Sequence, residues 1–166
     1  TCALPIYWGV VPDMVTMAKS LGNGAPIAAV TTRADIAKCM VGKTHFNTFG
    51  GNPVSAAAGL AVLDIIDEDG LQANTKARGA QFRAGLAKLQ QSYKLIGDVR
   101  GMGLMIGIEL VSDRATREAA RGPAADVLEA TKEMGLLIGK GGLDGNVLRL
   151  KPPMCITAED VDFALD

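Results

Sequence analysis

The sequence has 166 residues, of which 48% are hydrophobic and 21% charged, and its formal net charge at pH 7 is −1. This composition is typical of a soluble globular protein with a sizeable core, and the charge gives no electrostatic reason to bind nucleic acid or an anionic membrane. No apolar run approaches the roughly 18 residues that a transmembrane helix needs. Three scattered cysteines without CxxC spacing and a single histidine argue against a metal site and favour a reducing compartment.

The two ends of the sequence are unusual. It does not begin with methionine, and Thr1–Tyr7 has no basic residue and does not resemble a signal or transit peptide. These residues could be a translated cloning or sequencing adapter. The chain stops at Asp166, where a last helix has barely begun. We therefore expect a fragment of a longer protein.

The first predicted elements surround one lysine. Met14–Ala18 is an apolar run typical of a short strand, and Lys19 ends it. A tight turn follows, in which Gly22 and Gly24 are free to take positive φ angles and Pro26 fixes the exit. A lysine at the end of an apolar strand can be partly desolvated, which favours its neutral, nucleophilic form. Lys19 is therefore a candidate for capturing a carbonyl compound; the alternative is that it ends the strand and points into water.

A polar loop comes after a second predicted strand, Ile27–Thr32, and a short helix, Arg33–Met40. The loop ends in paired glycines followed by Asn52 and Pro53, a good N-cap and a good first helical residue. A helix N-terminus behind a glycine turn suits a phosphate group, because free N–H groups and the helix dipole both favour an anion. The alternative is a helix that is simply capped.

The rest of the sequence alternates helices and strands. Leu71–Tyr93 is a long amphipathic helix whose apolar stripe is typical of core rather than of a cofactor site. Ile96–Gly103 opens a second lobe, in which we expect Arg100 to be structural. The other predicted elements are helices at Val54–Asp67 and Ala124–Met134, strands at Leu104–Val111 and Leu136–Gly139, a polar connection at Ser112–Pro123 and a final helix that begins at Thr157–Asp160.

One arginine lies on an otherwise apolar strand, Val147–Leu150, which Pro152 and Pro153 bring to an end. If Arg149 is buried, it needs an anionic partner. The partner could be a carboxylate of the protein, or the carboxylate of a ligand held by the two-pronged guanidinium. From the residues alone, both alternatives remain open.

Three of these segments resemble motifs of one family, and they occur in the same order. Pro12–Lys19 is similar to the P-D-x-V-T-x-A run that precedes the cofactor lysine of the class III (omega-type) aminotransferases, which bind pyridoxal 5′-phosphate (PLP). Thr48–Pro53 resembles the family's T-[FY]-G-G-N-P segment, and Leu148–Pro153 resembles its L-R-x-x-P-P segment. The likeness runs from Trp8 onward, and the sequence looks closest to the mitochondrial group that acts on alanine and glyoxylate.

The resemblance implies a role for each matching residue. Lys19 would form the Schiff base with PLP and act as the catalytic amine. Thr48 would reach across a dimer interface to the cofactor phosphate of the partner subunit, with Asn47 beside it where the family often has a serine. Arg149 would hold the substrate carboxylate. The implied reaction moves an amino group from an amino acid to a 2-oxo acid, with alanine and glyoxylate as the expected pair.

The resemblance also implies an architecture. The expected fold is α/β, the C-terminal part of a PLP-dependent transferase of fold type I. Residues 1–93 would complete the large PLP-binding domain and its linking helix, and residues 94–166 would form a truncated small α+β domain. A homodimer or a dimer of dimers and a mitochondrial location are implied in the same way.

Family features that lie upstream of the lysine are missing from this sequence. They are the acid that pairs with the pyridine nitrogen, a glycine-rich phosphate turn and the aromatic residue stacked on the ring. We therefore expect this chain alone to be inactive or nearly so. The alternatives are another class III enzyme, such as an ornithine, 4-aminobutyrate or acetylornithine aminotransferase, or a non-catalytic piece that binds the cofactor weakly or only dimerises.

Overall fold

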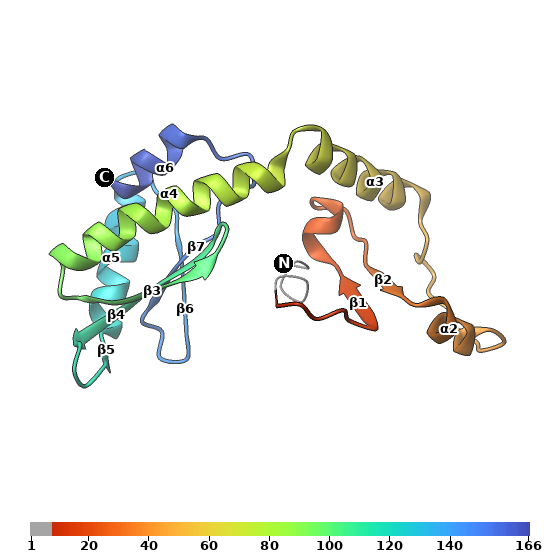
Figure 1. Ribbon diagram of the computed structural model, residues 1–166, viewed down its shortest axis with the longest axis horizontal. Coiled ribbons are helices and arrows are strands. Elements are labelled where there is room, and N and C mark those ends of the chain that lie inside the picture. Colours follow the sequence, from red (N-terminus) through yellow and green to blue (C-terminus); the bar gives the residue numbers. More distant parts are fainter. Residues whose placement is uncertain (1–7) are drawn as a thin grey trace. The chain divides into compact units, whose positions relative to one another are not determined.

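A computed structural model describes residues 8–166, so the expectations for Thr1–Tyr7 lie outside the described residues. The chain forms two compact units, Thr1–Asp69 and Gly70–Asp166, which are coloured red to yellow and yellow-green to blue in Figure 1. None of the helices between residues 8 and 166 is both long and apolar enough to cross a lipid bilayer.

The first unit combines a two-stranded antiparallel sheet with a long helix. Met14 pairs with Thr32 and Met17 with Ala29, so both predicted strands are present, with shorter bounds. The predicted helix Arg33–Met40 is divided into two short helices. The elements of this unit, in chain order, are β1 (Met14–Met17), the 3₁₀ helix η1 (Lys19–Gly22), β2 (Ala29–Thr32), α2 (Ala34–Ala37), the 3₁₀ helix η2 (Lys38–Met40) and α3 (Pro53–Glu68).

Helix α3 begins as its sequence predicts. The Asn52 side-chain oxygen accepts hydrogen bonds from the backbone N–H groups of Val54, at 3.0 Å, and Ser55, at 3.1 Å, and Pro53 is the first helical residue. These bonds satisfy two of the donors that every helix start leaves free, while the fixed φ of proline suits the first turn.

The second unit is an antiparallel sheet whose strands run in the order β3-β4-β7-β6, with β5 paired to the last residues of β4, Val111 and Asp113. One face carries the core, where Phe82 and Leu86 of α4 pack with Ile106, Ile108, Leu148 and Leu150. The elements are α4 (Leu71–Ser92), β3 (Ile96–Met102), β4 (Met105–Asp113), β5 (Glu118–Ala119), α5 (Arg121–Glu133), β6 (Gly139–Gly141), β7 (Val147–Leu150) and α6 (Ala158–Leu165).

Several bounds differ from the predicted ones because packing and pairing decide them. The two compact units divide between Asp69 and Gly70, since α4 supplies core side chains to the second unit. Strand β6 is a glycine-rich segment, one that intrinsic propensity does not favour as a strand, and it exists by pairing with β7. A short strand, β5, and the first turn of α5 occupy the end of the predicted polar connection.

Helix α6 starts with a reciprocal cap. The Thr157 hydroxyl accepts from the Asp160 backbone N–H at 3.1 Å, and the Asp160 carboxylate accepts from the Thr157 backbone N–H at 3.0 Å. The backbone bond from Thr157, followed by the bond to its side chain, lowers the pKa of Asp160 below its usual value. The charged form of this carboxylate therefore stabilises the fold.

The cap predicts an acid dependence of stability. Because folding lowers the pKa of Asp160, its contribution is present above the unfolded value of about 3.9 and is lost as pH falls through the folded value. Asp160→Asn should lower the urea midpoint at pH 7. Between neutral pH and pH 3, the urea midpoint of this variant should fall by less than that of the parent. The matched control is Asp126→Asn in α5, because Asp126 is exposed and has no side-chain hydrogen bond to the described residues. Equal acid sensitivity in the two variants would contradict the role of the cap.

Candidate functional site: the Lys19 turn, the Thr48 loop and Arg149

Lys19 is the first residue of η1, immediately after the extended residue Ala18. Its backbone φ is +58°, in the left-handed region. For a residue with a side chain this conformation costs roughly 1–2 kcal/mol, because Cβ approaches the following carbonyl oxygen. Strained residues of this kind persist where the surrounding structure holds them, and they are concentrated at functional sites.

The turn after Lys19 is held against α3 by one side chain. A Cβ added to Gly22 would lie 2.6 Å from Cγ2 of Ile27, and one added to Gly59 of α3 would lie 3.1 Å from Cδ1 of Ile27. Ile27 thus fills the space that the two glycines leave open, and both glycines are buried. This packing fixes η1, and with it the backbone from which Lys19 projects.

The conformations of the turn differ in part from the prediction. Gly24 has a positive φ of +104°, as predicted. Gly22 does not; the left-handed residue beside it is Asn23, with φ +45°. Gly22 is needed for close packing against Ile27 rather than for an unusual φ. Asparagine tolerates the left-handed region better than most residues with side chains, which explains why Asn23 can have the positive φ that was predicted for Gly22.

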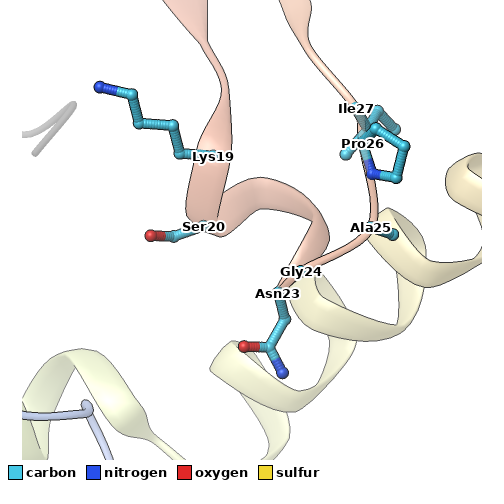
Figure 2. A pocket seen from close by; sticks show the side chains of 7 residues that line it. All are labelled: Lys19, Ser20, Asn23, Gly24, Ala25, Pro26 and Ile27. Carbon is cyan, nitrogen blue, oxygen red and sulfur yellow. The ribbon is translucent and has the colours of Figure 1, made fainter.

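Lys19 lies at an open hollow of about 480 Å³. Figure 2 shows its amine extending clear of the other labelled side chains, and no side-chain hydrogen bond or ion pair joins it to the described residues. The predicted desolvation is not found, because Lys19 is exposed and nothing in residues 8–166 covers its amine. The hollow is lined by Lys19, Ser20, Asn23, Gly24, Ala25, Pro26 and Ile27.

The loop before α3 uses Asn47 to build a turn. Its side-chain oxygen accepts from the Phe49 backbone N–H at 3.2 Å, and its carbonyl oxygen accepts from the Gly50 N–H at 3.0 Å. Asn47 also lines a second hollow, of about 570 Å³, whereas Thr48 is exposed and does not line it. Thr48 stands between two phenylalanines, Phe46 and Phe49, which are 82% and 80% exposed.

Arg149 lies on the face of the second unit's sheet that is opposite the core. Leu148 and Leu150 on either side of it are buried, while Arg149 is exposed. A Cβ added to the neighbouring Gly139 would lie 3.4–3.5 Å from the Arg149 side chain. The Arg149 guanidinium makes no hydrogen bond or ion pair with the described residues. One interpretation of the sequence paired Arg149 with a carboxylate of the protein. Residues 8–166 do not supply that carboxylate.

The predicted site residues are distributed over both units. Lys19, Asn47 and Thr48 belong to the first unit, and Arg149 belongs to the second. No group of three or more His, Cys, Asp or Glu side chains that could hold a metal ion is found in residues 8–166. Sequence reasoning missed the left-handed backbone of Lys19, since only glycine, asparagine and aspartate visibly signal that region.

Residues 3–166 match the family model described as Aminotransferase class-III. The chain belongs to this family. The match begins at residue 3, before Trp8, where we expected the likeness to begin. The family expected from the sequence is thus confirmed.

Two curated proteins show how similar this chain is to individual relatives. The mitochondrial alanine–glyoxylate aminotransferase 2 homolog 2 of Arabidopsis thaliana is 48% identical over 165 residues, which cover 96% of this chain and 35% of the relative. A leucine/methionine racemase of Thermococcus litoralis is 44% identical over 160 residues, which cover 96% of this chain and 36% of the relative. The chain therefore spans about one third of the length of these relatives.

Solved structures confirm the fold class. An amine transaminase from an uncultivated Pseudomonas species, solved in its PLP-bound form, matches with a TM-score of 0.87 and 33% identity. The match covers 96% of this chain and 38% of that one. Family membership and this neighbour imply dependence on PLP. The residues present here fit such a cofactor, because Lys19 lines an open hollow and its amine has no partner among residues 8–166.

The left-handed backbone predicts an unusual response to glycine. Lys19→Gly should be more stable than Lys19→Ala by about 1 kcal/mol, because glycine adopts φ +58° without strain. Lys38 is the matched control: its φ of −60° is ordinary, so Lys38→Ala should be the more stable of its pair. Urea unfolding of the four variants measures both differences. The same order at both positions would contradict the strain at Lys19.

Proposed function

We propose that this chain is part of a PLP-dependent transaminase that transfers an amino group from an amino acid, alanine, to a 2-oxo acid, glyoxylate. The proposal concerns a protein of the relatives' length, because the matched region covers only about one third of them. The observation that carries it is the exposed Lys19, held in a strained backbone at the mouth of a hollow and left without a protein partner among residues 8–166.

Lys19 supplies the reactive amine. Its Nζ would hold the cofactor, and the same nitrogen would accept a proton from the substrate carbon and return it. Bound PLP supplies an electron sink for the charge that develops on the substrate carbon. The fixed turn of η1, packed through Ile27, limits the positions that the lysine chain can reach, which favours productive proton transfer.

Arg149 binds the substrate carboxylate. Its guanidinium has two parallel N–H donors that match a carboxylate, and residues 8–166 leave these donors without an ion-pair partner. Two-pronged binding fixes the orientation of an amino acid, so that the bond to be broken is placed reproducibly. The Arg149 side chain is exposed and lies beside the glycines of β6, so no side chain at those positions stands between a small ligand and the guanidinium.

Thr48 and Asn47 contact the cofactor phosphate of a partner subunit in this proposal. Support comes from the exposure of Phe46 and Phe49 on either side of Thr48, because large apolar side chains grouped at a surface mark interaction sites. The second hollow adjoins the same loop and is lined by Asn47. The assembly is then a homodimer or a dimer of dimers. A mitochondrial location is proposed from the name of the Arabidopsis relative.

Other members of the family remain the alternatives. Ornithine, 4-aminobutyrate and acetylornithine aminotransferases would use the same lysine, threonine and arginine and differ elsewhere. The racemase relative, at 44% identity, is a further reason to measure substrate loss and inversion of configuration together. A non-catalytic piece that only dimerises would bind no substrate.

The proposed activity is tested with the full-length protein and added PLP. Alanine with glyoxylate should give the highest kcat/KM among donors that include ornithine and 4-aminobutyrate. Lys19→Ala should lower kcat at least about a thousandfold, and Arg149→Gln should raise the KM for alanine roughly tenfold or more. Lys38→Ala is the control for loss of a surface lysine. The 166-residue chain alone should show little or no turnover.

Turnover that survives Lys19→Ala would contradict the assignment of the catalytic amine. A preference for ornithine or 4-aminobutyrate would replace the proposed donor with one of the alternatives. Racemisation of the amino acid without formation of a 2-oxo acid would replace the proposed reaction.

A further inference from the structure

Two arginines share the outer face of the second unit's sheet but have different surroundings. The strand register pairs Arg100 of β3 with Gly107 of β4, Gly107 with Arg149 of β7, and Arg149 with Gly139 of β6. Residues directly opposite one another in antiparallel strands point to the same face. A single row across the sheet thus reads Arg100, Gly107, Arg149, Gly139, with a glycine on each side of Arg149.

Among the residues of β4 and β6 that pair with β7 on its outer face, the charged neighbour of Arg149 is Glu109. The direct neighbours of Arg149, Gly107 and Gly139, carry no side chain. Its diagonal neighbours are the residues paired with Val147, which are Glu109 of β4 and Gly141 of β6. Diagonal residues lie within reach of long side chains, so Glu109 could extend toward Arg149 past Gly107, where the nearest side-chain atoms are Val147 Cγ1 and Arg100 Cγ.

Glu109 is instead held by the other arginine. Arg100 Nη1 lies 2.5 Å from Glu109 Oε2 and 2.8 Å from Asp98 Oδ2. The Glu109 side chain is 30% exposed, against 51% for Arg100, so the pair is partly shielded from solvent. The hydrogen bonds that Arg100 donates, to Asp98 first and then to Glu109, raise the pKa of Arg100, which therefore keeps its charge. Arg149 makes no such contact with the residues that the structure describes.

We propose that Arg100 is a positioning residue that keeps Glu109 away from Arg149 and so leaves Arg149 free to bind the substrate carboxylate. The inference rests on the proposed function of Arg149. Without Arg100, Glu109 would lose its cationic partner, and Arg149 would be the nearest remaining cation by register. The resulting ion pair would compete with the carboxylate ligand for the same guanidinium.

The test compares Arg100→Gln, Glu109→Gln and the double variant in full-length protein with PLP. Arg100→Gln should raise the KM for alanine roughly fivefold, the size of a modest ion pair, with kcat at saturation little changed. The double variant should restore the KM, because no carboxylate is left to compete. A primary amine without a carboxylate should show no change. Arg100→Lys, which keeps the charge, should behave as the parent.

A binding measurement makes the test independent of turnover. Calorimetric titration with propanoate should show the same roughly fivefold loss in Arg100→Gln and its recovery in the double variant. The unfolding midpoint of every variant is measured as well, to show that it is folded. Should Arg100→Gln fail to fold, Arg100→Met replaces it, since it keeps an aliphatic stem beside Gly107.

The outcomes separate the two proposals. If Arg149→Gln does not weaken propanoate binding or raise the KM for alanine, the proposed function of Arg149 is wrong and this inference is wrong with it. If Arg149→Gln has those effects but Arg100→Gln does not, only the positioning role is overturned. A double variant as weak as Arg100→Gln would likewise overturn it, because removal of Glu109 would then give no recovery.

Discussion

The packing of Ile27 between two glycines determines where the candidate amine lies. A side chain at either Gly22 or Gly59 would occupy the space of Ile27, so η1 could not approach α3 as closely. That contact fixes the turn. Lys19 is the first residue of this turn and has a left-handed backbone. A conformation that costs free energy is retained at a residue whose side chain has no partner within residues 8–166. A strained backbone fits a lysine that is retained for the place of its amine rather than for the stability of the fold.

In the second unit, the sheet leaves Arg149 exposed. Its core face is closed by leucine and isoleucine, whereas its outer face, over the described residues, carries one arginine bound to two carboxylates and one with none. Glycines on both sides of Arg149 remove the side chains that would otherwise cover it. An exposed guanidinium with vacant donors and open surroundings suits a small anionic ligand. The amine and the cation that amino acid chemistry requires are thus each available, one in each unit.

Local sequence signals predicted the features that local chemistry controls. Asn52 and Pro53 start α3, and Thr157 caps α6. The resemblance of three short motifs was also sufficient to predict the family correctly. What could not be predicted depends on contacts between distant residues: the glycine strand β6 exists through its pairing with β7. The exposure of Lys19 has the same origin, because burial depends on what covers a residue rather than on the strand before it.

The central claim is that Lys19 is the amine that binds the cofactor. Its most direct measurement is borohydride reduction of the full-length protein mixed with PLP, followed by peptide mass spectrometry, with Lys19→Ala in parallel. We expect one phosphopyridoxyl group per chain on the peptide that contains Lys19, and none on the corresponding peptide of the variant. Labelling spread over surface lysines, with Lys19 unmodified, would contradict the assignment and with it the proposed function.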